Sequence, residues 1–66
     1  MHIELRSKLI DAVEYDEDCQ HLTLFMSTGQ IRVFTDVPEH VFRDLQATKS
    51  PDSYYMKLIK DRYPSA

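Results

Sequence analysis

The sequence predicts an α+β domain in which a three-stranded antiparallel meander is followed by two short helices packed on one face. Three observations predict it: apolar and polar residues alternate in the first half, a single glycine separates two such segments, and two prolines mark helix starts in the second half. The 66 residues make one domain, 1–66. A chain this short buries only about 60% of its unfolded surface, so we expect marginal stability and no deep substrate pocket.

Three segments have the composition and alternation of strands. Ser7–Tyr15 is the first, and the polar residues Asp16–Asp18 then interrupt the pattern with a turn. Gln20–Ser27 alternates strictly between apolar and other side chains. Gln30–Thr35 is the returning strand, and Ile3–Arg6 supplies a candidate fourth strand.

The turn at Ser27-Thr28-Gly29 joins the last two strands as a hairpin, with glycine where a positive φ is needed. Two registers fit this turn. A two-residue loop places Ile31 and Val33 on the face of Leu22, whereas a three-residue loop with a glycine bulge places Arg32 and Phe34 there. We favour the first register, because it buries two aliphatic residues and exposes the arginine.

The first helix begins at Asp36-Val37-Pro38-Glu39. The aspartate can cap the helix, the glutamate can reciprocate, and the proline suits the first turn. Apolar residues follow at helical spacing: Val41, Phe42 and Leu45.

The second helix begins at Ser50-Pro51, with the serine as cap and the proline in the first helical position. Side chains at helical spacing follow: Tyr54, Tyr55, Leu58, Ile59 and Arg62. Pro64 ends the helix. We expect Lys57 and Asp61 to form an i,i+4 ion pair on its outer face.

The formal net charge of −3 argues against a simple nucleic-acid binder, because lysine and arginine drive phosphate binding. The charge is unevenly spread. Acidic residues gather in the N-terminal part: Glu4, Asp11, Glu14, Asp16, Glu17 and Asp18. Basic residues gather in the C-terminal part: Lys49, Lys57, Lys60 and Arg62. A local basic patch is therefore compatible with the negative total.

The sequence also indicates where in the cell the protein is expected. Its apolar runs are far shorter than the roughly 20 residues that span a bilayer, so we expect no membrane association. The first residues lack the basic start and apolar stretch of a signal peptide. Cys19 is the only cysteine, which excludes the internal disulfides typical of small secreted domains. We therefore expect a cytoplasmic protein.

Several landmarks recur in a fixed order after the glycine: Val37-Pro38, Ala47, Ser50, Tyr54-Tyr55, Ile59 and Tyr63. In this order the chain resembles the KTSC domain, a family named after an appendix at the C-terminus of some lysyl-tRNA synthetases that also occurs as small free-standing bacterial proteins. The resemblance covers roughly Ser7 to Tyr63. It implies an α+β fold and hints at RNA. The chain departs from the family pattern at two places, where a Tyr-x-Tyr is replaced by Arg32-Val33-Phe34 and a glycine by Asp52.

The candidate binding residues combine aromatic and basic side chains: Arg32, Phe34, Lys57, Lys60 and Arg62. Aromatic faces stack bases at about 1–3 kcal/mol each, and cations hold phosphates. Tyr54 and Tyr55 have a competing role, because a small core needs large side chains.

Catalytic and metal sites find little support. Cys19 and His21 are too few ligands for structural zinc, and the Asp16–Asp18 turn lacks the spacing of an EF-hand. A Cys19–His40 dyad has nothing further to support it. We expect no metal, no cofactor and no enzymatic activity.

The leading hypothesis is a non-catalytic cytoplasmic interaction module that binds a protein partner through an exposed strand edge or the Arg32–Phe34 face. The alternative is an RNA-binding accessory domain that uses the last strand and the C-terminal helix. A small enzyme is a distant third.

Overall fold

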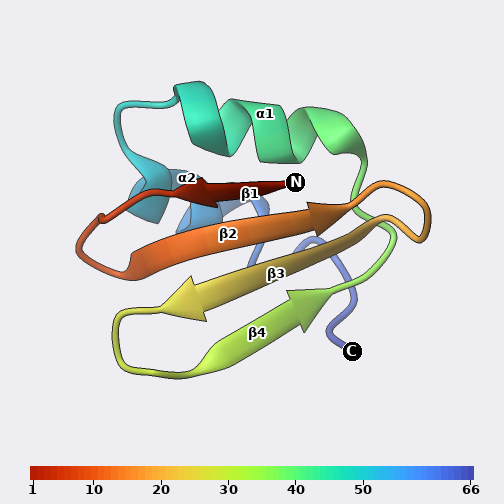
Figure 1. The fold of residues 1–66 in the computed structure, drawn as a ribbon, viewed down its shortest axis with the longest axis horizontal. Helices are drawn as coiled ribbons and strands as arrows, with labels where there is room; N and C mark the ends of the chain where they lie inside the picture. Colours follow the sequence, from red (N-terminus) through yellow and green to blue (C-terminus); the bar gives the residue numbers. More distant parts are fainter.

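The computed structural model describes residues 1–66 as four strands followed by two helices (Figure 1). Their bounds are β1 His2–Glu4, β2 Ile10–Asp16, β3 His21–Met26, β4 Ile31–Phe34, α1 Glu39–Ala47 and α2 Pro51–Leu58. The sheet order is β1-β2-β3-β4, and each neighbouring pair is antiparallel. The predicted α+β meander is confirmed, and the candidate fourth strand is present as β1.

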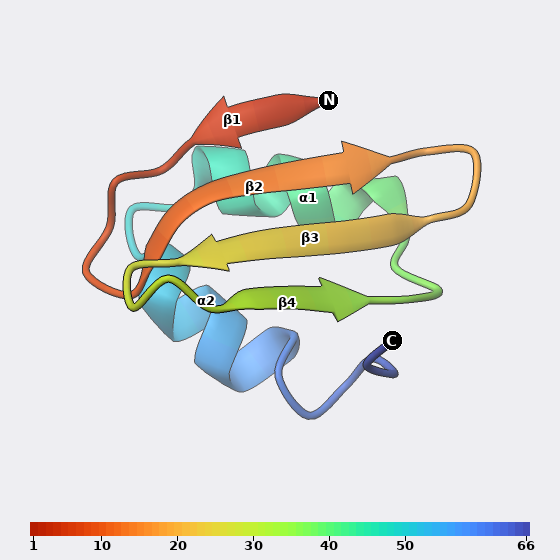
Figure 2. The ribbon, with the colours of Figure 1, turned by 60° about the horizontal axis from the view of Figure 1, so that its bottom comes forward.

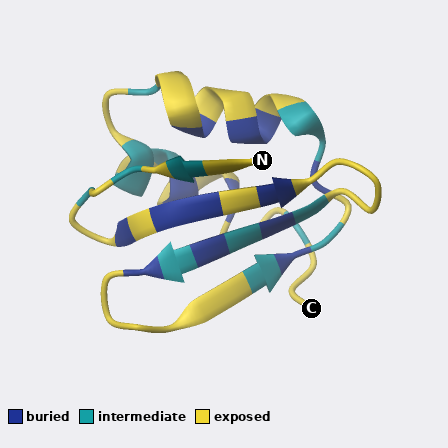
Figure 3. Ribbon diagram, viewed as in Figure 1, coloured by how far each residue is buried: buried dark blue, intermediate teal, exposed yellow.

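The molecule has two layers, because both helices lie against the same face of the sheet (Figure 2). A single apolar core fills the space between the layers, and burial alternates along the strands (Figure 3). Its largest fully buried side chains are Phe34, Ile10, Leu22, Leu24, Leu45 and Ile59. Each such side chain contributes about 1.5–3 kcal/mol relative to an exposed one. Neither helix has the length and apolar composition needed to cross a membrane.

The favoured hairpin register is wrong. In the structure Leu22 pairs with Phe34 and Leu24 pairs with Arg32. The strand β4 therefore presents Phe34 to the core. Phe34 is 1% exposed, whereas Ile31 is 63% exposed on the other face. Burial of the large aromatic ring in the core outweighs burial of the aliphatic side chain, since apolar burial scales with the area removed from water. Arg32 also points to the helix side, but it lies at the rim and stays exposed.

The loop geometry explains how this register forms. The Gly29 N–H donates to the Met26 carbonyl at 2.9 Å, and the Met26 N–H donates to the Gln30 carbonyl at 2.8 Å. The three residues 27–29 therefore form the loop between the paired residues Met26 and Gln30. Gly29 has φ +93°, a conformation that disfavours residues with a Cβ. This is the glycine-bulge alternative of the two registers that the sequence allowed.

The helix starts are close to those predicted, but the capping details differ. Pro38, rather than Asp36, holds the N-cap position of α1, and Asp36 adopts a left-handed φ of 57°. Glu39 pairs with Arg43, whose Nε donates to it at 2.7 Å. Glu39 therefore pairs with a residue one turn further along α1 and does not form the reciprocal capping box.

The second helix begins where predicted, with Pro51 first and Ser50 before it, although the Ser50 hydroxyl makes no capping hydrogen bond. The helix ends at Leu58, earlier than expected. Asp61 therefore lies beyond the helix, and the expected ion pair with Lys57 is not formed.

Asp52 ties α2 to the loop between β1 and β2. Its Oδ1 accepts from the Ser7 hydroxyl at 2.7 Å and from the Leu9 N–H at 3.0 Å. The aspartate that departs from the glycine of the family pattern thus has a clear structural role: it holds the start of the second helix against the opposite end of the chain.

The chain ends along the outer edge of β4. Ser65 bridges to Phe34, the Thr35 N–H donates to the Pro64 carbonyl at 2.8 Å, and the Ala66 N–H donates to the Val33 carbonyl at 2.9 Å. These bonds cover part of an edge that would otherwise present unpaired backbone groups.

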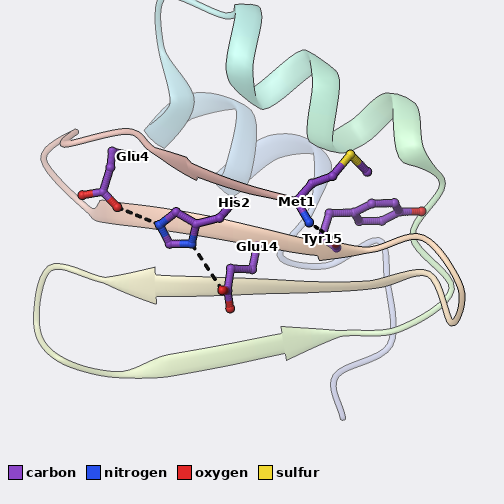
Figure 4. Close-up of polar contacts among 5 residues, drawn as sticks. All are labelled: Met1, His2, Glu4, Glu14 and Tyr15. Carbon is purple, nitrogen blue, oxygen red and sulfur yellow. Dashed lines mark hydrogen bonds and ion pairs between the residues drawn. The ribbon is translucent and has the colours of Figure 1, made fainter.

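The short strand β1 is attached by backbone pairing and by the imidazole of His2 (Figure 4). Its Nε2 lies 2.8 Å from Glu4 Oε2 and its Nδ1 lies 3.3 Å from Glu14 Oε1. The α-ammonium of Met1 donates to the Tyr15 carbonyl at 3.0 Å. The hydrogen bond with Glu4, more than any other cause, raises the pKa of His2 above its ordinary value of 6.5.

Leu24→Ala should destabilise the fold by roughly 2–5 kcal/mol, because the side chain is fully buried and its loss leaves a cavity. In a domain with only a few kcal/mol of stability, most of the variant should be unfolded at room temperature. Circular dichroism during thermal unfolding measures this. A melting temperature within a few degrees of the wild type would contradict the core position of Leu24.

Asp52→Ala should lower the free energy of unfolding by about 1–3 kcal/mol, because the Leu9 N–H and the Ser7 hydroxyl lose a charged acceptor. Urea denaturation of this variant and of Asp61→Ala, an exposed aspartate in no ion pair, gives the comparison. Equal losses in the two variants would mean that the Asp52 anchor contributes nothing.

His2→Gln should reduce stability most at low pH. A pKa raised by folding means that protonated His2 stabilises the native state, and this contribution is full below pH 6.5 and disappears as pH rises through the raised value. Urea unfolding of both proteins from about pH 5.5 to about pH 8.5 keeps the carboxylates ionised. A difference between the two proteins that stays constant, or grows toward high pH, would exclude the proposed linkage.

Candidate functional site

Arg32 and Lys60 come from distant parts of the sequence and line the same depression. It has a volume of about 210 Å³ and lies between α2 and the hairpin of β3 and β4. The remaining lining residues are Leu9, Met26, Thr28, Gln30, Tyr55 and Met56. We call this the basic depression. The structure thus brings together two of the five predicted binding residues.

The basic depression has an apolar part as well as its two cations. Met56 is 46% exposed and Leu9 is 38% exposed, so both offer apolar surface to a partner. Tyr55 and Met26 also line it, although both belong mostly to the core. A mixed lining of this kind resembles a protein interface more than a purely ionic site.

The cations of the basic depression are not neutralised within the domain. The only arginine or lysine in an ion pair is Arg43, which pairs with Glu39. The guanidinium of Arg32 makes one weak contact, a donation to Gln30 Oε1 at 3.4 Å. Lys57 and Arg62 are likewise exposed and unpaired, but they do not line the depression.

Phe34 is not available to a ligand. Its side chain is in the core, with its ring edge-on to that of Tyr55 at a centroid distance of 6.2 Å. Sequence reasoning placed it on the binding face because the favoured register turned it outward. The combination of Arg32 with an exposed neighbouring aromatic therefore does not exist in the folded protein.

Tyr54 has a structural contact of its own. Its hydroxyl donates to Asp44 Oδ2 at 2.8 Å and so joins α2 to α1. Desolvation, and secondarily this bond, raise the pKa of Tyr54 to about 12. Of the aromatic residues considered for base stacking, Phe34 and Tyr55 are buried, and Tyr54 and Tyr63 are half-buried.

A second surface, which sequence reasoning missed, is the open face of the sheet that the helices do not cover (Figure 2). Phe25, Ile31 and Val33 lie on it, because they alternate with the core residues of β3 and β4. Phe25 pairs with Ile31, and Val33 pairs with Thr23. The alternation was visible in the sequence, but only the correct register places these three residues on one face.

The same face is acidic toward β1 and β2. A broad depression of about 520 Å³ lies there, lined by Met1, His2, Glu14, Tyr15, Asp16, Glu17, Asp18, His21 and Thr23. The Asp18 N–H donates to Asp16 Oδ1 at 3.0 Å, and this bond lowers the pKa of Asp16. We call this the acidic depression.

Cys19 lies exposed in the turn between β2 and β3. Desolvation, followed by a hydrogen bond to Asp16, raises the pKa of the thiol. A raised pKa disfavours the thiolate that nucleophilic catalysis requires.

Comparison with known proteins agrees with the resemblance seen in the sequence. The family model of the KTSC domain matches residues 6–63. The crystal structure of a KTSC domain protein from Yersinia pestis superimposes with a TM-score of 0.92 at 18% sequence identity, covering 100% of this chain and 93% of that one. No curated protein matches the chain significantly. The matched family model spans most of the sequence, and the chain therefore belongs to the KTSC domain family.

Proposed function

We propose that this KTSC domain is a non-catalytic, cytoplasmic interaction module that binds an acidic segment of a partner protein at the basic depression. The observation that carries the proposal is the convergence of Arg32 and Lys60, both unpaired, on one depression with exposed apolar walls. An arginine beside apolar surface is the composition of an interface anchor.

The chemistry of the depression favours a carboxylate next to an apolar side chain. A guanidinium binds a carboxylate through two parallel hydrogen bonds, and Lys60 adds a second charge. Met56 and Leu9 can then pack against the neighbouring apolar side chain of the partner. Such a contact removes water from the ion pair, which strengthens it beyond the weak pairs of a free surface.

The lack of a catalytic arrangement supports a binding role. His2 and His21 line the acidic depression, whereas His40 lies on α1 and lines neither depression, so no histidine lies beside the basic depression. The raised pKa of Cys19 works against a thiol nucleophile.

RNA is the second candidate, because Arg32, Lys57, Lys60 and Arg62 are all free of internal ion pairs. The burial of Phe34 and Tyr55 weighs against it, since single-stranded RNA binding gains much of its energy from base stacking. Contacts to phosphates alone would be weak for a domain of charge −3 and steeply dependent on salt.

Arg32→Ala and Lys60→Ala should leave the melting temperature nearly unchanged and should abolish capture of the partner. The immobilised domain is incubated with lysate of its native cells, with and without ribonuclease, and bound proteins are identified by mass spectrometry. We expect the same protein to be retained by the wild type in both lysates, because its carboxylates, and not RNA, contact the depression.

Lys49→Ala is the matched control, since Lys49 is an exposed and unpaired cation outside the depression. Retention by all three variants would contradict the proposal. Capture that ribonuclease removes, together with salt-sensitive binding of an RNA oligonucleotide, would favour the RNA hypothesis. A collapsed melting transition in Arg32→Ala would instead make Arg32 a structural residue.

A further inference from the structure

We propose that the open face of the sheet is a second binding surface, and that it takes a protein segment in which lysine or arginine alternates with apolar residues. The surface consists of Phe25, Ile31 and Val33 beside the acidic depression. It lies on the opposite side of the sheet from the basic depression and is argued independently of the function proposed for that depression.

The open face carries three neighbouring apolar side chains, of which Ile31 is exposed and Phe25 and Val33 are half-buried. An antiparallel sheet with one covered face normally presents polar side chains on the other. Here Phe25 and Ile31 are cross-strand partners, and Val33 follows two positions along the same strand. Ile31 is 63% exposed, the largest value among the exposed apolar residues of the chain. Single exposed apolar residues are ordinary, whereas neighbouring apolar residues rimmed by polar ones have the composition of an interaction site.

The negative charge of the open face favours a partner that carries positive charge. The acidic depression carries the carboxylates of Glu14, Asp16, Glu17 and Asp18. The strand residues that share the open face contain no lysine or arginine: His2, Glu4, Ala12, Glu14, Asp16, His21, Thr23, Phe25, Ile31 and Val33. The nitrogen groups nearby are the imidazoles of His2, which contacts Glu4 and Glu14, and of His21, and the ammonium of Met1, which is bonded to the Tyr15 carbonyl.

The same charge distinguishes between possible occupants. Phosphates would be repelled by the acidic depression, so this face does not suit RNA. Two copies of the domain packed by their open faces would bring two acidic surfaces together, which costs free energy. A basic segment avoids this repulsion and makes two kinds of favourable contact. Its cations reach the carboxylates, and its apolar side chains cover Phe25, Ile31 and Val33.

The test uses the intact domain and three synthetic peptides, titrated while the backbone amide signals are followed by NMR. The first peptide alternates lysine with valine, the second alternates glutamate with valine, and the third alternates lysine with serine. We expect the first to bind and to shift the amides of Thr23, Phe25, Ile31 and Val33. The other two should bind at least about tenfold more weakly, because each lacks one half of the proposed chemistry.

Two variants test the assignment to this face. Ile31→Thr keeps a β-branched residue at an exposed strand position, and Glu17→Gln removes one charge of the acidic depression at a residue in no ion pair. Both should fold as the wild type and should weaken binding of the lysine–valine peptide at least about threefold. Asp61→Asn is the matched control for the charge change, since Asp61 is exposed, in no ion pair and outside both depressions, and this variant should bind the peptide as tightly as the wild type.

Several outcomes would overturn the proposal. One is the absence of any amide shift at millimolar peptide. Another is equal binding of the lysine–serine peptide, which would reduce the effect to ionic attraction. Self-association of the wild type that Ile31→Thr abolishes would assign the face to a second copy of the chain. Shifts confined to α2 and unchanged in Ile31→Thr would place the peptide elsewhere.

Discussion

The burial of Phe34 is the constraint on which both candidate surfaces depend. With this ring in the core, the three preceding residues of β4 are assigned to faces without further choice: Arg32 turns toward the helices, and Ile31 and Val33 turn toward the open side. A slip of one residue would exchange all four positions. Gly29 permits this register, because its left-handed conformation lets a three-residue loop close the hairpin.

Only a few side-chain hydrogen bonds fix the helices of this small domain in place. The buried Tyr15 hydroxyl donates to the Val37 carbonyl at 2.6 Å, which holds the segment that leads into α1. Tyr54 joins the two helices through Asp44, and Asp52 fastens α2 to the first loop. No buried side-chain polar atom lacks a partner. Each bond joins two different parts of the fold, so each restrains packing that apolar burial alone would hold loosely.

The sequence was sufficient for the fold because its evidence is local. Alternation in β3 and proline at the start of α2 act within a few residues. The bounds of β3 and the start of α2 were therefore predicted closely, whereas the end of α2 at Leu58 was not. The hairpin register was not decided locally, because two loops fitted the same turn and the choice rested on which side chains the helices cover. Arg32 and Lys60 were both candidate binding residues in the sequence, but their convergence on the basic depression could not be predicted, since they come together only when α2 packs beside the hairpin.

The net charge of −3 turns out to be a poor guide to what this domain can bind, because the fold separates charges that the total combines. Acidic side chains of β2 and its turn share the open face with Phe25, Ile31 and Val33, while Arg32 and Lys60 lie on the helix side. Electrostatic attraction between proteins acts over about a Debye length, so each face presents its own charge to a partner. The domain exposes 4297 Å², and a standard interface covers roughly 800 Å² of each protein. Two such interfaces fit on opposite sides of the domain, so the two proposed surfaces do not compete for the same area.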